Sequence, residues 1–122
     1  MSLISYAIQM QKLNKRITER EIYDFMHTIM PIIKYCHDND IIHRDIKLDN
    51  LMFGSRDGDF KDIVLIDFGH SRILRKNDIS SSAGIGTDHF NSPELTWQKL
   101  DVKVSHNYKT DIWSIGVCVV TL

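Results

Sequence analysis

The sequence has little of what marks several large classes of protein. It has only two cysteines, Cys36 and Cys118, which are too few for a disulfide framework and are expected to be reduced thiols. Its 15 Lys and Arg residues nearly balance its 16 Asp and Glu residues, so the basic excess typical of nucleic-acid and membrane-surface binding is absent. No run of about 18 apolar residues predicts a transmembrane helix, and the first residues lack a signal-peptide pattern. These absences predict an intracellular protein, cytoplasmic or nuclear, with neither nucleic acid nor membrane as a partner.

The spacing of the apolar residues predicts three helices. Residues 3–9 place apolar side chains at helical spacing, and residues 18–36 do so over about four turns. Thr18 and Glu21 form a capping box at the start of the second segment, which we expect to be a single helix with a kink near His27, because Pro31 interrupts the pattern. Residues 111–122 are apolar nearly all round, as in a core helix, and we expect one face to stay uncovered in a chain of this extent.

Short apolar runs between polar loops predict strands. Residues 41–42 form one such run, and residues 51–53 and 63–66 form two more with a turn at 55–59, so the latter pair is expected to form a hairpin. Residues 69–91 are polar without periodicity and are expected to form a long loop. The 122 residues, 43% of them hydrophobic and 25% charged, suit a single domain. The fold class we expect is α+β, mainly helical, with a small β-hairpin region.

Residues 42–53 carry the side chains that point to chemistry. Asp45 is placed to orient a hydroxyl group and accept its proton, because it lies in a loop where side chains can converge on a ligand. Asn50 and the later Asp67 offer the oxygen ligands that Mg²⁺ takes together with phosphate oxygens. Lys47 supplies a cation for the negative charge of a phosphoryl group. Together these residues predict a phosphate and metal site.

The motifs resemble those of one family. Residues 43–50 read H-R-D-x-K-x-x-N and residues 67–69 read D-F-G, which resemble the catalytic loop and metal-binding motif of eukaryotic protein kinases. Residues 86–94 resemble the segment that ends the kinase activation loop, with Ser92 where the family usually has Ala. Residues 111–116 resemble the start of the family's central buried helix.

The resemblance implies a protein-kinase-like C-terminal lobe that is incomplete. It runs from about the interlobe hinge to the central buried helix, so residues 1–122 are expected to be a partial kinase domain without the N-lobe and the last C-lobe helices. The sequence contains no G-x-G-x-x-G segment and no V-A-I-K segment, which cover and set the nucleotide phosphates in the family. We therefore expect little or no ATP turnover by this chain alone.

The resemblance also implies the role of each motif residue. Asp45 is similar to the family's catalytic Asp, Lys47 to the residue that contacts the γ-phosphate, and Asn50 and Asp67 to the Mg²⁺ ligands. Met52 falls where an apolar residue packs under the adenine ring. ATP and Mg²⁺ are thus the expected cofactors of the complete domain, and a protein is the expected substrate.

Other positions of the resemblance concern specificity and regulation. Lys47 and Thr87 favour Ser/Thr over Tyr kinases, because Ser/Thr kinases use such a Thr to brace the catalytic Asp and Lys. Arg44 is similar to the residue that pairs with an activation-loop phosphate in regulated kinases. The candidate phosphorylation sites are Ser80, Ser81 and Ser82.

The remaining motif residues have supporting roles in the family. His43 and Phe68 resemble residues of an internal spine, and Gly69 completes the D-F-G motif. Asp111 resembles the carboxylate at a helix start that accepts hydrogen bonds from catalytic-loop amides. Glu94 resembles a residue that pairs with an Arg further along a complete domain.

Several alternatives stay open on the sequence. Small-molecule kinases of the aminoglycoside or choline type share H-x-D-x-x-x-x-N, but they usually have Gly where this chain has Arg44 and lack the later segments. The spacing of the six His residues fits no zinc site. Within the kinase reading, the chain is a truncated Ser/Thr kinase, a non-catalytic lobe that binds another kinase or its substrate, or a fragment completed by a separate kinase N-lobe.

Overall fold

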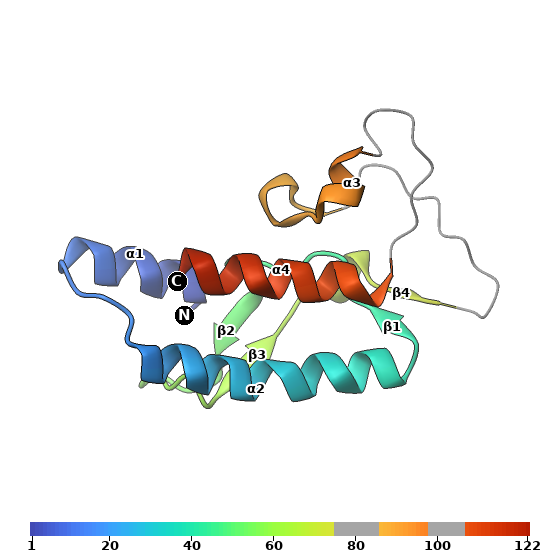
Figure 1. Cartoon of the computed structure of the whole chain (residues 1–122). Helices are drawn as coiled ribbons and strands as arrows, with labels where there is room; N and C mark the ends of the chain where they lie inside the picture. Colours follow the sequence, from blue (N-terminus) through green and yellow to red (C-terminus); the bar gives the residue numbers. More distant parts are fainter. Residues whose placement is uncertain (75–85, 98–106) are drawn as a thin grey trace.

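The computed structural model describes residues 1–74, 86–97 and 107–122. Within these residues, three helices of ten or more residues, α1 (Leu3–Lys12), α2 (Glu19–Asp38) and α4 (Tyr108–Thr121), surround two small antiparallel sheets (Figure 1). The five-residue helix α3 (Pro93–Trp97) lies to one side of α4. None of the helices in the described ranges is long and apolar enough to cross a lipid bilayer.

Helix α2 forms the long base of the fold, and its start confirms the predicted capping box. The Thr18 side chain accepts from the backbone N–H of Glu21 at 3.2 Å, and a Glu21 carboxylate oxygen accepts from the backbone N–H of Thr18 at 2.7 Å. The helix continues through Pro31, so the prediction of a single helix is confirmed. Its apolar stripe is buried and consists of Phe25, Ile29, Ile33 and Cys36.

Helix α1 is fastened to the rest of the fold by Tyr6. The Tyr6 hydroxyl donates to Glu21 of α2 at 3.1 Å. Its ring meets Phe53 and Phe60 edge-on, with centroids 5.2 and 5.5 Å apart, in an arrangement that aromatic pairs favour. One side chain thereby joins α1 to the start of α2 and to the hairpin region.

The predicted hairpin is present and lies against α2. Strand β2 (Leu51–Phe53) pairs with β3 (Ile63–Leu65), with Leu51 opposite Leu65 and Phe53 opposite Ile63. These four side chains are buried, because alternate residues of each strand point to the same face. The pair carries the loop of residues 43–50 at its start and Asp67 at its end.

The long loop expected over residues 69–91 contains three short elements within the described part of the chain. Strand β4 (Arg72–Ile73) pairs with β1 (Ile41–Ile42), and short 3₁₀ turns form at Phe68–His70 and Asp88–Phe90. Arg72 and Ile73 form no apolar run that would indicate a strand, and their pairing depends on a partner distant in the chain. The predicted strand at residues 41–42 is confirmed.

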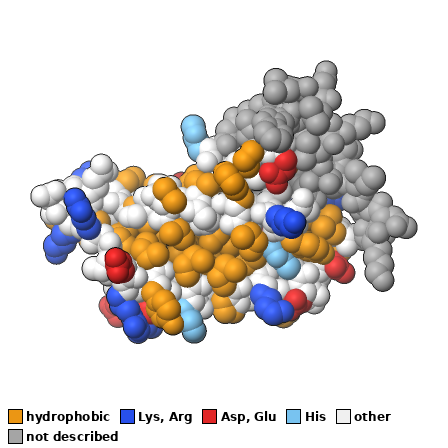
Figure 2. All heavy atoms as spheres, in the orientation of Figure 1, with side chains coloured by type: hydrophobic (Ala, Val, Ile, Leu, Met, Phe, Trp, Pro, Cys, Tyr) orange, Lys and Arg blue, Asp and Glu red, His pale blue; other side chains and the backbone are white. Residues whose placement is uncertain are grey.

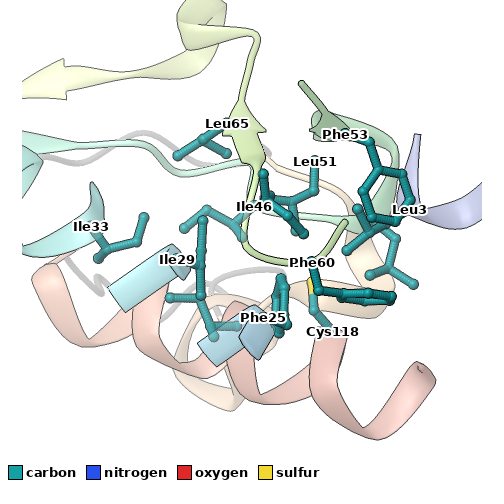
Figure 3. Packing of buried hydrophobic residues seen from close by; sticks show 13 residues of the cluster. Leu3, Phe25, Ile29, Ile33, Ile46, Leu51, Phe53, Phe60, Leu65 and Cys118 are labelled. Atoms are coloured by element: carbon teal, nitrogen blue, oxygen red, sulfur yellow. The ribbon is translucent and has the colours of Figure 1, made fainter. Parts of the chain in front are cut away.

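An apolar cluster lies between the helices and the β2–β3 pair (Figure 3). It consists of Leu3, Phe25, Ile29, Ile33, Ile46, Leu48, Leu51, Phe53, Phe60, Ile63, Leu65, Ile115 and Cys118. Helix α4 contributes only Ile115 and Cys118 to this cluster, whereas its Ile112, Trp113 and Val120 are 43%, 48% and 88% exposed. The predicted helix is therefore present with one face buried, and Figure 2 shows apolar side chains gathered in a band over it.

Candidate active site

A buried carboxylate on α4 holds the loop that follows β1. The two oxygens of Asp111 accept the backbone N–H groups of His43 and Arg44, each at 3.0 Å. Arg44 has a φ of 67°, a conformation that side-chain-bearing residues rarely adopt and that persists only where the surroundings impose it. His37 at the end of α2 lies 2.9 Å from the same carboxylate. Asp111 thus joins α2, α4 and the loop.

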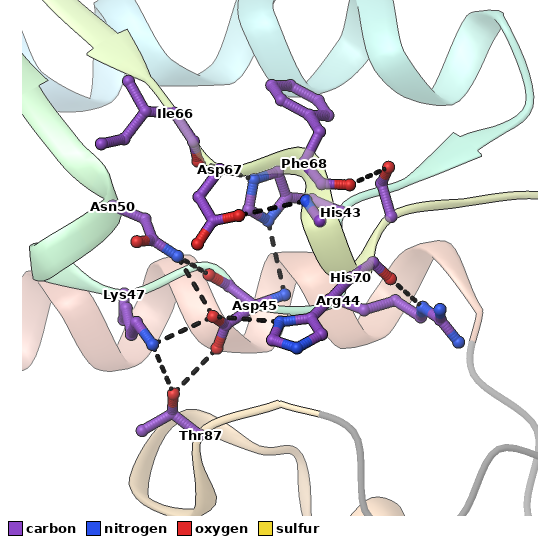
Figure 4. Close-up of polar contacts among 12 residues, drawn as sticks. His43, Arg44, Asp45, Lys47, Asn50, Ile66, Asp67, Phe68, His70 and Thr87 are labelled. Carbon is purple, nitrogen blue, oxygen red and sulfur yellow. Dashed lines mark hydrogen bonds and ion pairs between the residues drawn. The ribbon is translucent and has the colours of Figure 1, made fainter.

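Asp45 lies at the centre of a group of hydrogen-bond donors (Figure 4). One carboxylate oxygen accepts from the Thr87 hydroxyl at 2.8 Å. The other lies 2.9 Å from Lys47 Nζ, 3.2 Å from Asn50 Nδ2 and 3.4 Å from His70 Nδ1. The side chain of Asp45 is buried, so these donors replace the water that a carboxylate otherwise binds.

These donors set the charge of Asp45. Burial by itself would raise the pKa of the carboxyl group, but the hydrogen bonds from Lys47 and Thr87, the charge of Lys47 and the contact with His70 together lower that pKa below its ordinary value. Asp45 is therefore ionised at neutral pH, and an ionised carboxylate only accepts hydrogen bonds.

Thr87 and Lys47 join the loop to the segment that begins at residue 86. Lys47 Nζ donates to the Thr87 hydroxyl at 2.9 Å, and that hydroxyl in turn donates to Asp45. Gly86 has a φ of 100°, and a Cβ there would lie 2.9 Å from the Arg44 carbonyl oxygen and 2.6 Å from Asn91 Oδ1. Glycine is needed at this position, because both the backbone angle and the close approach exclude a side chain.

Asn50 and Asp67 lie on neighbouring strand ends. Asn50 Nδ2 donates to the Asp45 backbone carbonyl at 2.8 Å and to its carboxylate, so the Asn50 amide oxygen is turned away from Asp45. The Ile66 N–H donates to the Asn50 carbonyl at 2.9 Å, which holds the start of the D-F-G segment beside the loop. Asp67 is exposed and has a φ of 61°, and its carboxylate accepts from the Gly69 N–H at 3.1 Å.

The donor set formed by these two residues fits Mg²⁺. One carboxylate and one amide oxygen are hard ligands, and Mg²⁺ typically takes one or two carboxylates together with phosphate oxygens and water. Within the described ranges, no group of three or more His, Cys, Asp or Glu side chains could hold a metal by itself. A cation at Asn50 and Asp67 would therefore depend on phosphate oxygens for the rest of its coordination.

His43 and Phe68 pack against one another beneath the loop. Their ring centroids are 4.8 Å apart and the rings meet edge to face. His43 Nε2 lies 3.1 Å from the Ile66 carbonyl, which only accepts, and Nδ1 accepts from the Asp45 N–H at 3.4 Å, so the proton is on Nε2. Burial lowers the pKa of His43, although the Ile66 carbonyl and nearby carboxylates oppose the shift. The ring is a neutral support for the loop.

The structure separates the remaining predicted residues from this cluster. Met52 is half-buried in β2 opposite Val64, and Glu94 is half-buried in α3. The candidate phosphorylation sites Ser80, Ser81 and Ser82 lie outside the described residues.

Sequence reasoning missed two histidines of the site. His70 follows the D-F-G motif directly, and its ring reaches Asp45 while its backbone carbonyl accepts from Arg44 Nε at 2.6 Å. His37 precedes the H-R-D motif on α2 and binds Asp111. The position of His70 beside a motif was the one signal available, since neither histidine belongs to a periodic pattern.

The sequence matches the model of a known family. A family model described as "Protein kinase domain" matches residues 3–122. The chain belongs to the protein kinase family. In this protein kinase, the matched span includes the loop around Asp45, the D-F-G segment and helix α4.

Individual kinases are similar over most of this chain. A calcium/calmodulin-dependent protein kinase of Metarhizium anisopliae is 36% identical over 107 residues, which are 88% of this chain and 26% of that protein. The serine/threonine-protein kinase polo of Drosophila melanogaster is 34% identical over 94% of this chain and 18% of its own length. The mitogen-activated protein kinase pmk-3 of Caenorhabditis elegans is 34% identical over 94% of this chain and 23% of its own length. The chain therefore spans about a quarter or less of the curated relatives it matches.

Proposed function

We propose that this protein kinase transfers the γ-phosphoryl group of ATP to a Ser or Thr hydroxyl of a protein substrate, with Asp45 orienting that hydroxyl and accepting its proton. The observation that carries the proposal is the buried, ionised Asp45 carboxylate between Lys47 and Thr87. A general base must lie within hydrogen-bond reach of the proton that it takes, and Asp45 sits on a loop that β1, α4 and the β2–β3 pair hold in place.

Residues near Asp45 would bind the phosphate groups of ATP and the Mg²⁺ ion. Lys47 Nζ, 2.9 Å from the Asp45 carboxylate, places a positive charge where the phosphoryl group would meet the hydroxyl. Asn50 and Asp67 would hold Mg²⁺, which neutralises charge on the ATP phosphates when it is bound. Met52 would pack against the adenine ring from β2.

The contact between Lys47 and Thr87 supports Ser/Thr specificity. The Thr87 hydroxyl accepts from Lys47 and donates to Asp45, so a single side chain fixes the distance between the proposed base and the proposed phosphate contact. Such bracing is what the resemblance leads us to expect of a Ser/Thr kinase.

We also propose that a phosphate on Ser80, Ser81 or Ser82 pairs with Arg44. Burial and the nearby charge of Arg72 lower the pKa of Arg44, while Asp111 opposes the shift. Two like charges close together favour a phosphate anion between them, because a phosphate group accepts several charge-assisted hydrogen bonds.

The test compares two aspartates of the same loop. Phosphate transfer to a generic basic protein is measured with the intact protein, and with chain 1–122 supplied with a purified protein-kinase upper lobe. Asp45→Asn is expected to reduce transfer by at least about 100-fold, the usual size of a general-base contribution. Asp67→Ala is expected to reduce transfer as well, because it removes the carboxylate proposed to hold Mg²⁺. Asp49→Asn removes an exposed carboxylate of the same loop and is the matched control.

Two results would contradict this assignment. Transfer that survives Asp45→Asn at the level of Asp49→Asn would exclude Asp45 as the base. Robust transfer by chain 1–122 without an upper lobe, abolished by Asp67→Ala, would overturn our expectation that the chain needs the glycine-rich and V-A-I-K segments that its sequence does not contain.

A second candidate function is binding without catalysis, in which the chain captures another kinase or its protein substrate. The exposed face of α4 favours it, because Ile112, Trp113 and Val120 line an open groove of about 740 Å³. Exposed apolar patches of this kind mark interaction sites. Calorimetric titration with a purified substrate protein separates the candidates. Binding that survives Asp45→Asn and is lost in Ile112→Asp, in a protein that transfers no phosphate, would favour the second.

A further inference from the structure

Asp45 has a fourth donor that differs from the other three. Lys47, Asn50 and Thr87 lie 2.8 to 3.2 Å from the carboxylate oxygens, whereas His70 Nδ1 lies at 3.4 Å. The His70 side chain is 52% exposed, against 22% for Lys47. His70 is therefore the longest and most open contact of the cluster.

The Asp45 side chain is closed off by its neighbours. It is only 3% exposed, with Lys47, Asn50 and His70 on one carboxylate oxygen and Thr87 on the other. A hydroxyl that is to give its proton to Asp45 cannot reach the carboxylate until one of these side chains moves. Lys47 and Thr87 also bind each other, and Asn50 holds Asp45 through a second bond to its backbone carbonyl. His70 has a single contact with the carboxylate, so it is the donor that leaves.

The backbone around His70 allows the ring to move by itself. Arg44 Nε donates to the His70 carbonyl at 2.6 Å, and the Ser71 N–H donates to the Phe68 carbonyl at 3.0 Å. These bonds hold the main chain of the turn in place. A rotation of the His70 side chain towards solvent is therefore sufficient to expose the carboxylate oxygen.

We propose that His70 covers Asp45 until a substrate hydroxyl displaces its ring, so that His70 keeps water from the proposed base. This inference rests on the proposed function, because it gives a role to a neighbour of the proposed base. His70 is a positioning residue in this scheme, since it touches Asp45 and not the reacting atoms.

The scheme predicts what happens without the ring. In phosphate transfer, the substrate oxygen forms a bond to the γ-phosphorus, the bond from that phosphorus to the bridging oxygen of ADP breaks, and the hydroxyl proton goes to Asp45. A water molecule at the same carboxylate oxygen enters the same reaction: its oxygen bonds to phosphorus, its proton goes to Asp45, and ADP and inorganic phosphate are released. Loss of the His70 ring should therefore favour hydrolysis over transfer.

The first test uses three variants of the intact protein. His70→Ala removes the donor, His70→Asn places an amide nitrogen near the position of Nδ1, and His27→Ala removes an exposed histidine of α2 as the control. The ratio of ATP hydrolysis without protein substrate to phosphate transfer is measured for each. We expect that ratio to rise about tenfold in His70→Ala, the effect of losing one hydrogen bond to a charged group. We expect the other two variants to stay close to the unchanged protein.

The second test does not depend on activity. Asp45 is labelled with a carbodiimide and an amine, and the rate of modification is read by mass spectrometry, with folding checked by circular dichroism. His70→Ala should be labelled several-fold faster than the unchanged protein, and His70→Asn at nearly the unchanged rate.

The two tests distinguish a failure of the inference about His70 from a failure of the proposed function. Equal labelling in His70→Ala and the unchanged protein would overturn the inference, as would faster labelling without a rise in hydrolysis in a protein that transfers phosphate. If Asp45→Asn retains transfer, the proposed function fails on its own, and labelling alone decides whether His70 covers Asp45.

Discussion

Replacing Asp111 with alanine is expected to lower the free energy of unfolding by about 3–5 kcal/mol, the usual effect of removing one partner from a buried charged network. The carboxylate is almost fully buried and accepts from the N–H groups of His43 and Arg44 and from the His37 ring. Each hydrogen bond to a charged group contributes about 1.5–3 kcal/mol, and each buried donor left unpaired costs about 1–3 kcal/mol. A domain has only about 5–15 kcal/mol of stability, so this variant should lie close to unfolding.

Two further variants divide this effect between the three bonds. His37→Ala removes one bond and leaves both backbone bonds, so we expect a loss of about 1–2 kcal/mol. Asp111→Asn keeps one acceptor oxygen and turns an amide donor towards a backbone N–H, so its loss should lie between those of His37→Ala and Asp111→Ala. The unfolding free energy is measured by urea denaturation followed by far-ultraviolet circular dichroism.

The double variant His37→Ala/Asp111→Ala tests the reasoning. Once Asp111 is replaced, the His37 ring retains only its contact with the Tyr108 ring, whose centroid lies 4.8 Å away. Replacing His37 in the Asp111→Ala background should therefore cost less than His37→Ala alone. Losses that simply add would show that His37 does not act through Asp111. A loss below about 1 kcal/mol in Asp111→Ala would refute the view that Asp111 holds the loop.

Three further predictions use the same urea assay. Gly86→Ala should destabilise by about 1–3 kcal/mol because of its backbone angle of 100° and the nearby Arg44 carbonyl, and an unchanged midpoint would contradict this. Thr18→Ala should cost about 1 kcal/mol through loss of the helix cap, whereas Thr18→Ser should cost little. The pKa of Asp45 is below its ordinary value of 3.8 in the folded chain, so its stabilisation is present above that pH and is lost as the pH falls further. Asp45→Asn should therefore lose less unfolding free energy than the unchanged protein as the pH falls through that acidic range. Plots of unfolding free energy against pH with equal slopes for the two proteins would argue against the lowered pKa of Asp45.

Local chemistry made part of the fold predictable from the sequence. The cap and the apolar stripe of α2 depend on residues close together in the sequence. Thr18 therefore indicated the start of the helix, and the spacing of residues 18–36 indicated its buried face. The hairpin followed in the same way, since two apolar runs flank a turn. The H-R-D and D-F-G segments indicated the site residues because the residue types needed for phosphate chemistry stand close together there.

The parts that could not be predicted depend on contacts between distant residues. Strand β4 exists only because Ile41–Ile42 lies beside it. The contact of His70 with Asp45 depends on how the turn after β3 meets the loop after β1. The exposed face of α4 was predictable as apolar, but its orientation is decided by α2, which packs against the opposite side through Ile115 and Cys118.

The bond from Asp111 to the His43 N–H also has a consequence for the order in which the chain acquires its structure. The two residues are 68 positions apart, so the loop emerges from a ribosome long before the carboxylate that holds it. At about 5–20 residues per second, roughly 3 to 14 s of synthesis separate them. Until Asp111 has been made, its carboxylate cannot hold Arg44 in the unfavourable backbone conformation. The loop that carries Asp45 therefore takes its final shape only after helix α4 has been made, although its own residues lie near the middle of the sequence.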